Sequence, residues 1–508
     1  MRSLLACSIV LLLSLPPLAL AVEGDSIAVA AQQGDMGRVR DLLRAHVDVN
    51  APGEDGTAAL HWLVYRQELE SARALLRAGA DVNRPNRYGV RPLHLAIGND
   101  DVEMVRLLLK SGADVSLADT TGETPLMMAS DLGDPVIVSS LLDKGASVDA
   151  RDPEYQQTAL MLAARGGHTA VARLLIKHGA QVDAQTRTGP VPAFRTPASN
   201  SGSKGAGIVR GGWPERGERD PTPGAKTALL YAAREGHLDT VELLLSSGAK
   251  LEMADADGVT PLLMAVLNGQ LPTARFLIDQ GADVNAMDWY GETPLWAAVD
   301  IRDLDIPAPH QGNGVDRPAA FELVRTILAH GANPNVRTKE YPPQRRWITR
   351  IGSVSWVDFT GQTPFLRAAL AGDVEVMRLL LEFHADPNIA TYGGTTPLMA
   401  AAGVNWTVAQ TYDEGPDQLL AAVKLAASAG NDVNAVNSMG VTALHGAANR
   451  GSNDIIRFLV EKGARLDVAD RQGRTALTWA QGVFLATHPP EVKPQTIALL
   501  KQLQNGAS

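Results

Sequence analysis

Apolar and polar residues along this chain form blocks that repeat about every 33 residues. Each block opens with a short phrase, at its fullest Gly-x-Thr-Pro-Leu-x-x-Ala, and continues into a leucine-rich segment such as residues 104–109 or 241–245. The third position of the phrase falls at Thr57, Arg91, Thr124, Thr158, Thr227, Thr260, Thr293, Thr363, Thr396, Thr442 and Thr475. Successive spacings are 34, 33, 34, 69, 33, 33, 70, 33, 46 and 33 residues, so nearly all are one period, or two periods plus an insertion. This period predicts a solenoid of stacked units.

The phrase predicts the start of a helix. A Thr side chain accepts hydrogen bonds from the free N–H groups of a first turn, and Pro suits the first helical position, where its missing N–H is not needed. The leucine-rich segment predicts a second helix that ends at a glycine in the left-handed conformation. These glycines are Gly79, Gly112, Gly145, Gly179, Gly248, Gly281, Gly331 and Gly463. The polar stretch that follows has the composition of a hairpin turn, so each unit should consist of two helices and a projecting finger.

Two helices and a hairpin finger at this period resemble the ankyrin repeat. The resemblance rests on the Thr-Pro-Leu phrase, on Gly-His-Leu-Asp-Thr-Val-Glu-Leu-Leu-Leu at 236–245 and on Gly-Ala-Asp-Val-Asn at 281–285. It covers a degenerate first unit at about 25–50, ten full units and a last partial unit from residue 473. It implies an all-α ankyrin-repeat solenoid at 22–508, with a β-hairpin finger in each unit and polar cap units at the ends. Because each unit buries its apolar face against its neighbours, we expect one elongated, curved domain.

Residues 1–21 differ from the repeats. Arg2 precedes an apolar run at 4–20, and small residues stand at Ala19 and Ala21, the two positions that a signal peptidase reads. The alternative is an uncleaved membrane anchor, but a proline pair interrupts the run, which is also short for a spanning helix. The pattern favours a cleaved signal peptide, no membrane insertion after cleavage, and a periplasmic or secreted protein.

Composition narrows the possible chemistry. Cys7, the only cysteine, lies within the leader, so the mature chain would have no thiol for a disulfide, a nucleophile or a cysteine-ligated metal. Removing Arg2 with the leader leaves 45 basic residues against 56 acidic ones, a net charge of about −11. This charge disfavours nucleic acid or an anionic membrane surface as the main partner.

Four insertions interrupt the repeats. Two stand at finger positions: 186–225, whose eight glycines and six prolines predict a flexible excursion, and 339–358, which predicts an ordered strand-like finger. The other two, 301–318 and 403–416, separate the two helices of one unit and should emerge at the opposite end of the helix pairs from the fingers. Insertions in repeat proteins often gather on functional faces, although they are also tolerated where they have no role.

Aromatic and basic residues on the fingers are the candidate partner contacts. Exposed Tyr and Trp anchor interfaces well because they offer a large contact area with few rotatable bonds. The candidates are Tyr88, Trp289, Tyr290, Arg345, Arg346, Trp347, Trp356 and Tyr392. The alternative for each ring is that it packs on a neighbouring finger. Trp62 and Trp296, which follow the Leu of the phrase, are expected to pack between units.

No motif predicts catalysis. His61, His94 and His445 follow the Leu of the phrase, where the ankyrin resemblance implies a structural hydrogen bond. The chain has no His-Glu-x-x-His pattern and no Gly-x-Ser-x-Gly elbow. The sequence therefore predicts no enzyme activity, no catalytic residue, no cofactor and no metal site.

The function that the sequence favours is a monomeric, non-enzymatic scaffold that binds another protein along its fingers and concave face, as the ankyrin resemblance implies. The first alternative is an extracytoplasmic binder of a glycan or another extended ligand, which would use the finger aromatics as stacking platforms. Rings gathered on one strip would favour that ligand, and rings packed against one another would not. Less favoured are a secreted, host-directed effector and an enzyme whose ionisable residues from separate insertions converge, for instance Arg345, Arg346 and Asp413.

Overall fold

The structure is a computed structural model of the chain. It describes residues 26–53, 55–188, 224–304, 315–339, 358, 360–406, 411, 414–483 and 490–506. The predicted signal peptide and four candidate contacts, Arg345, Arg346, Trp347 and Trp356, lie outside these residues, as does Asp413.

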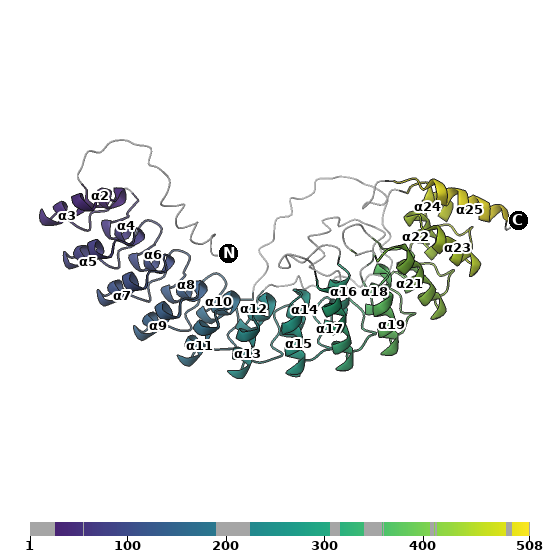
Figure 1. The fold of residues 1–508 in the computed structure, drawn as a ribbon, viewed down its shortest axis with the longest axis horizontal. Helices are drawn as coiled ribbons and strands as arrows, with labels where there is room; N and C mark the ends of the chain where they lie inside the picture. The colour runs from purple at the N-terminus through teal and green to yellow at the C-terminus, as the bar shows by residue number, and fades with distance from the viewer. Residues whose placement is uncertain are drawn as a thin grey trace. The chain divides into compact units, whose positions relative to one another are not determined.

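Helices account for all the regular secondary structure of the described residues, which hold no β-strand and one isolated bridge, between Ala469 and Thr475. The prediction of an all-α repeat solenoid is confirmed (Figure 1). The helices are α2 (Ile27–Gln33), α3 (Met36–Arg44), α4 (Ala59–Tyr65), α5 (Leu69–Arg77), α6 (Pro92–Gly98), α7 (Val102–Lys110), α8 (Pro125–Leu132), α9 (Pro135–Asp143), α10 (Ala159–Gly166), α11 (Thr169–Lys177), α12 (Ala228–Glu235), α13 (Leu238–Ser246), α14 (Pro261–Leu267), α15 (Leu271–Asp279), α16 (Pro294–Arg302), α17 (Arg317–Ala329), α18 (Pro364–Ala371), α19 (Val374–Glu382), α20 (Pro397–Ala401), α21 (Pro416–Ser428), α22 (Ala443–Arg450), α23 (Asn453–Glu461), α24 (Ala476–Ala480) and α25 (Pro494–Gly506).

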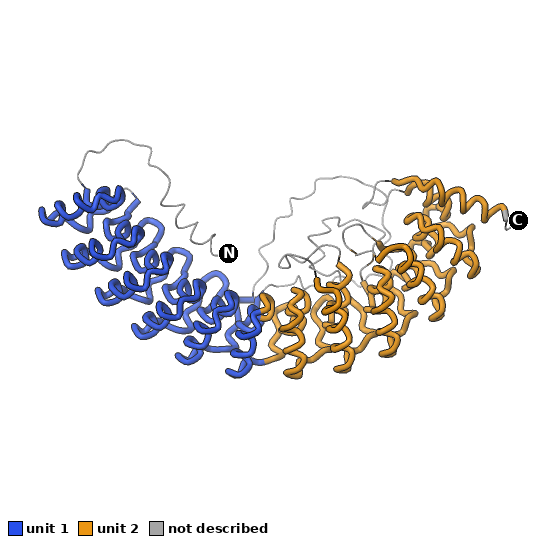
Figure 2. Tube along the Cα trace, in the orientation of Figure 1, with its two compact units in different colours: residues 1–188, 224–232, 237–250 blue, residues 189–223, 233–236, 251–508 orange. Residues whose placement is uncertain are grey.

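The chain divides into two compact units, where the sequence predicts one continuous domain. Unit 1 comprises residues 1–188, 224–232 and 237–250, and unit 2 comprises 189–223, 233–236 and 251–508 (Figure 2). A repeat contacts only its neighbours, so no core runs the length of the chain and a solenoid can divide between helix pairs.

Stacking within each unit follows one rule: the first helix of a pair contacts the first helix of the next pair, and second helices contact second helices. In unit 1, α2, α4, α6, α8 and α10 form the first series, and α3, α5, α7, α9, α11 and α13 form the second. In unit 2, the series run from α14 to α24 and from α15 to α25. Leu63, Ile97 and Met104 are among the side chains that this stacking buries completely.

Threonine caps start the helices as the phrase predicts, with one exception. Thr124 Oγ1 accepts a hydrogen bond from the Met127 N–H (3.3 Å), and Thr363 Oγ1 accepts one from the Leu366 N–H (3.2 Å). Thr57 is not a cap, because α4 begins one residue later than the phrase assigned to it and Ala58 holds the cap position. The third position of that phrase is therefore Ala58, which lies 33 residues before Arg91.

The fingers are tight turns rather than the predicted β-hairpins. In the finger at 286–292, the Asp288 N–H donates to the Glu292 carbonyl (3.1 Å) and the Gly291 N–H donates to the Asp288 carbonyl (3.1 Å). Gly291 has a φ of 82°, the left-handed conformation that glycine adopts most readily. One closing hydrogen bond across so short a turn does not make a strand pair.

Successive fingers of unit 2 are joined by hydrogen bonds between main-chain atoms. The bonds run from Trp289 N–H to Asp257 O (2.8 Å), from Lys339 N–H to Tyr290 O (2.7 Å), from Tyr392 N–H to Thr360 O (3.1 Å), from Ser438 N–H to Gly393 O (2.7 Å) and from Arg471 N–H to Met439 O (2.9 Å). We call these connected fingers the finger row. Because the fingers hold one another, the row is a fixed edge of unit 2.

Candidate functional site

The finger row carries those candidate partner contacts of unit 2 that the structure describes. Tyr392 is the most accessible, with 49% of its surface exposed. Trp289 in the same row is half-buried, as is Tyr88 on a finger of unit 1. Tyr290 is corrected: it is only 2% exposed, so its ring lies inside the fold and is not an accessible anchor.

The rings of the finger row are held by neighbouring side chains. Trp289 and Tyr290 meet edge to face, with ring centroids 4.9 Å apart. Arg337, from the preceding finger, places its guanidinium 4.3 Å from the centroid of the Tyr392 ring and donates to the Ala390 carbonyl (2.6 Å). Packing between neighbouring fingers, the alternative for these rings, is therefore present, and it leaves Tyr392 partly free.

Sequence reasoning missed several exposed apolar side chains on the fingers. Met287 and Val436 are exposed in unit 2, and Tyr155 is exposed in unit 1. An apolar residue within a polar turn was the available signal, as in Asn-Ala-Val436-Asn-Ser. With Tyr392, they place apolar surface at the tips of several fingers.

The histidines of the repeat phrase have structural roles, as the ankyrin resemblance implies. His61 Nδ1 accepts a hydrogen bond from the Ala58 N–H (3.2 Å), and His445 Nδ1 accepts one from the Thr442 N–H (3.2 Å). Burial lowers the pKa of His61 and of His445, and it lowers the pKa of His94 to about 4. These rings are neutral parts of the helix starts.

The predicted burial of the phrase tryptophans is confirmed. Trp62 follows the Leu of its phrase on α4, and Trp296 holds the same position on α16. Both side chains are buried. These two rings therefore belong to the packing of the solenoid and not to an exposed surface.

A second candidate site is a buried group of charged side chains in unit 2, which we call the ionic cluster. It lies where the end of α16 and the start of α19 meet the residues that begin α17 and precede α21. Its members are Asp300, Arg302, Asp303, Arg317, Arg367, Asp373, Glu375 and Glu414. Charges taken out of water require partners, so the pairing within this group decides what it can do.

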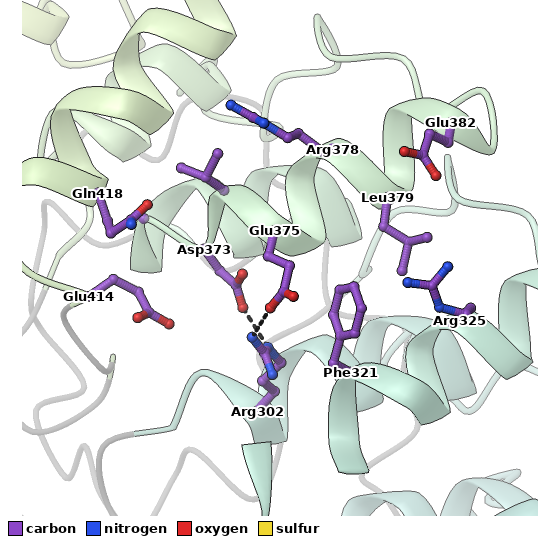
Figure 3. A pocket seen from close by; sticks show the side chains of 12 residues that line it. Arg302, Phe321, Arg325, Asp373, Glu375, Arg378, Leu379, Glu382, Glu414 and Gln418 are labelled. Carbon is purple, nitrogen blue, oxygen red and sulfur yellow. Dashed lines mark hydrogen bonds and ion pairs between the residues drawn. The ribbon is translucent and has the colours of Figure 1, made fainter. Parts of the chain in front are cut away.

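Two arginines of the ionic cluster are closely paired. Arg367 Nε lies 2.5 Å from Asp300 Oδ1, and both side chains are fully buried. Arg302 donates from Nε to Asp373 Oδ2 (2.6 Å) and from Nη2 to Glu375 Oε2 (3.0 Å) (Figure 3). These pairs fix the end of α16 against α18 and α19.

Asp303 is the least satisfied member of the ionic cluster. Its side chain is 0% exposed, neither carboxylate oxygen has a hydrogen-bond partner, and the nearest cation, Arg317 Nη1, is 3.7 Å away. Burial raises the pKa of Asp303 well above its usual range, and the neighbouring Asp373 carboxylate raises it further. One oxygen each from Asp303, Asp373 and Glu414 lie within 4.8 Å of one another.

This convergence is absent from the predictions made from sequence. Asp303 and Arg317 flank the described gap in the insertion at 301–318, and Glu414 lies near the end of the insertion at 403–416. Both insertions interrupt helix pairs that stack on the pair α18/α19, whose short turn contains Asp373. Their ends meet because all three turns lie at the same end of neighbouring pairs.

An open groove of about 650 Å³ lies beside the ionic cluster (Figure 3). Phe321 of α17 lines it, and the guanidiniums of Arg302 and Arg325 lie 5.3 and 5.2 Å from the Phe321 ring centroid. Acidic residues such as Glu375 and Glu382 line the same groove. Its mixed charges do not favour an anionic ligand over a cationic one.

Comparison with known proteins identifies the repeats. The family model described as "Ankyrin repeats (3 copies)" matches residues 27–119, 101–186, 229–306 and 415–483, and the model "Ankyrin repeat" matches 290–339 and 360–392. The chain belongs to the ankyrin-repeat family. Ankyrin repeats mediate protein interactions, and the family is generally non-catalytic, so this chain is of a kind suited to a protein-binding scaffold.

One curated relative is the inactive serine/threonine-protein kinase TEX14 of Bos taurus. This ankyrin-repeat chain is 33% identical to it over 84 residues, which are 16% of the chain. The match spans only 6% of the relative's own length, so it compares a few repeats rather than two whole proteins. Among the helices that the structure describes, none is both long and apolar enough to span a bilayer.

Proposed function

We propose that this ankyrin-repeat chain is an exported, non-enzymatic scaffold that binds another protein through the finger row of unit 2. The observation that carries the proposal is the exposed apolar surface on this row, contributed by Met287, Tyr392 and Val436. Most other large apolar side chains of the described helices are buried between repeats. Apolar tips on a fixed edge are suited to contact with a partner.

The main-chain bonds between fingers support this function energetically. Binding is opposed by the ordering of loops and side chains, at about 0.5–1.5 kcal/mol for each flexible side chain that is immobilised. The hydrogen bonds that join Trp289, Tyr392 and Ser438 to preceding fingers order the backbone before a partner arrives. Most of the contact energy of the exposed tips is then available for binding.

A protein partner is favoured over a glycan by the arrangement of the rings. A sugar-stacking platform needs a free aromatic face. The Trp289 ring is packed edge to face against the buried Tyr290, and Arg337 covers one face of Tyr392. Exposed Met and Val side chains, by contrast, are common contacts in protein interfaces and offer no stacking surface to a sugar.

Export is proposed from the leader sequence at 1–21. Its basic start, apolar run and small residues at Ala19 and Ala21 are the support. Mass spectrometry of the protein recovered from the producing cells should show an N-terminus at Val22, in a fraction outside the cytoplasm. An intact chain beginning at Met1 in the cytoplasm would refute export without affecting the binding proposal.

The binding proposal is tested by crosslinking capture from the native exported fraction. The wild-type chain is compared with the triple variant Met287→Ser/Tyr392→Ser/Val436→Ser and with a matched control, Val136→Ser/Val492→Ser, which changes exposed apolar residues away from the fingers. A protein captured by the wild type and the control but lost from the triple variant supports the proposal. Equal capture by all three places the contact elsewhere, and glycan-array binding that the triple variant loses favours the alternative ligand.

A further inference from the structure

We propose that Asp303, Asp373 and Glu414 form a site in unit 2 for a divalent cation that prefers oxygen ligands, with Ca²⁺ as the best candidate. The site is built from three separate places: the end of α16, the turn before α19, and the segment that leads into α21. It is independent of partner binding, since none of its residues belongs to the finger row.

The spacing of the oxygens fits such an ion. One carboxylate oxygen from each residue lies within 4.8 Å of the other two. Calcium binds oxygen at roughly 2.3–2.6 Å, so oxygens on opposite sides of one ion are roughly 4.6–5.2 Å apart. The three carboxylates can therefore reach one ion without large movement, and water can complete its shell. The donors are all oxygen, which suits Ca²⁺ rather than a metal that prefers nitrogen or sulfur.

Asp303 provides evidence for a ligand beyond a simple grouping of acids. Its carboxylate is completely buried, neither oxygen accepts a hydrogen bond, and it faces the carboxylates of Asp373 and Glu414. A buried carboxylate without hydrogen bonds is costly, since it has lost water and gained little in return. An ion between the three groups would give both oxygens a strong partner.

The charge balance of the ionic cluster identifies the competitor for this ion. Leaving aside Glu375, which is mostly exposed, the cluster holds four carboxylates and three guanidiniums. Arg317 contacts all three proposed ligands: it lies 3.7 Å from Asp303 and from Asp373, and it pairs with Glu414. Its side chain is 23% exposed and it is the first residue of α17, so it can turn toward solvent.

With Arg317 turned outward, four carboxylates would face the guanidiniums of Arg302 and Arg367 and one divalent ion. The charges then balance, which they do not with the arginines alone. Arg317 therefore acts as the internal cation of the ion-free state, and binding exchanges it for the metal. A purely structural salt bridge would not predict this exchange.

The test is calorimetric titration of CaCl₂ into the full-length protein after removal of metal with chelator. Four proteins are compared: wild type, Asp303→Asn, Arg317→Gln and the control Glu382→Gln, which removes an acid from the same helix as Asp373's turn but outside the three ligands. We expect one saturable site in the wild type and the control. Asp303→Asn should weaken it at least about tenfold, and Arg317→Gln should tighten it several-fold because the competing cation is gone.

The outcomes separate a site from general attraction to an acidic chain. Absence of saturable binding at about 10 mM Ca²⁺, a concentration that would fill even weak extracellular sites, overturns the proposal. So does binding that Asp303→Asn leaves unchanged, because it would then arise from other acids. If circular dichroism shows that Asp303→Asn is unfolded, Glu414→Gln replaces it, since that partly exposed side chain is outside the core. Ca²⁺ should also raise the Tm of the wild type and leave the Tm of the weakened variant unchanged.

Discussion

The turn before α7 in unit 1 and the turn before α19 in unit 2 begin with the same device and end with different roles. Asp101 caps α7 by accepting from the Met104 N–H at 3.0 Å, and Asp373 caps α19 by accepting from the Val376 N–H at 3.0 Å. Asp101 is half-buried, whereas Asp373 is buried and its second oxygen pairs with Arg302 at 2.6 Å.

The difference arises from what surrounds the two turns. The pairs next to α7 have turns of only a few residues, so Asp101 keeps contact with water. The pairs on either side of α18/α19 carry the insertions at 301–318 and 403–416, whose ends supply Asp303, Arg317 and Glu414. A repeated local motif has thus become the centre of a charged site because longer turns stand beside it.

The largest test of this comparison is the pair Asp373→Ala and Asp101→Ala. Asp373→Ala should lower the free energy of unfolding by about 3–5 kcal/mol, because it leaves Arg302 buried without its nearest partner. Asp101→Ala should lower it by only about 1 kcal/mol, the usual value of a helix cap. Urea denaturation followed by circular dichroism measures both, and equal losses would show that the burial of Asp373 adds nothing.

The next test sharpens the role of buried pairing in unit 2. Arg367→Met should cost about 3 kcal/mol, since Asp300 would remain buried and charged without its partner. The double variant Arg367→Met/Asp300→Leu should recover most of this loss, because both buried charges are gone. Each variant is measured by the same denaturation assay, and losses that simply add would mean that the two side chains do not depend on each other.

Unit 1 has a buried acid of its own, which makes a pH test possible. Burial raises the pKa of Glu123 to about 7, with Asp119 adding to the shift. Since the folded state holds this proton more tightly than the unfolded state, the stability that it contributes is present below about pH 4.5 and is lost as the pH rises through about 7.

Glu123→Gln should therefore raise the free energy of unfolding at pH 8 by about 1–2 kcal/mol and have little effect at pH 4. The measurement is urea denaturation at both pH values. Asp134→Asn, at a cap of the same unit, serves as a control that should not show this pH dependence. A gain that is equal at pH 4 and pH 8 would contradict the assignment of the proton to Glu123.

The smallest expected effect concerns the end of α19. His384 has a φ of 64° where the equivalent position after α7 is Gly112, with a φ of 90°. His384→Gly should stabilise unit 2 by about 0.5–1 kcal/mol, because glycine adopts this conformation without a Cβ clash. Thermal unfolding should show a slightly higher Tm, and a lower one would mean that the histidine side chain stabilises the helix end by more than the backbone strain.

The fold was predictable because it depends on residues that recur. Thr124 and Thr363 cap helices in the same way in both units, and the phrase around them gives both the period and the helix starts. The error at Thr57 came from a second small polar residue beside the true position, which a spacing of 34 instead of 33 does not exclude. The division into two units was not predictable, because every pair presents a similar sequence to its neighbours.

The ionic cluster was not predictable, because its members are not periodic. Asp373 has the sequence context of an ordinary cap, and the convergence of Asp303 with Glu414 depends on how two insertions of different length fold back. One signal was available: Arg367 stands on α18 where Met128 and Leu162 stand in the equivalent phrases. A charged residue at a position that is otherwise apolar indicates a buried partner, but it does not identify Asp300 as that partner.

The finger row has a consequence for how this protein can change over evolutionary time. Its connecting bonds use only the N–H of one finger and the carbonyl of another, as between Ser438 and Gly393. Side chains at the tips contribute nothing to those bonds, so substitution at positions such as Val436 leaves the framework intact. Selection can therefore explore new partners one residue at a time, while the edge that presents those residues is inherited unchanged.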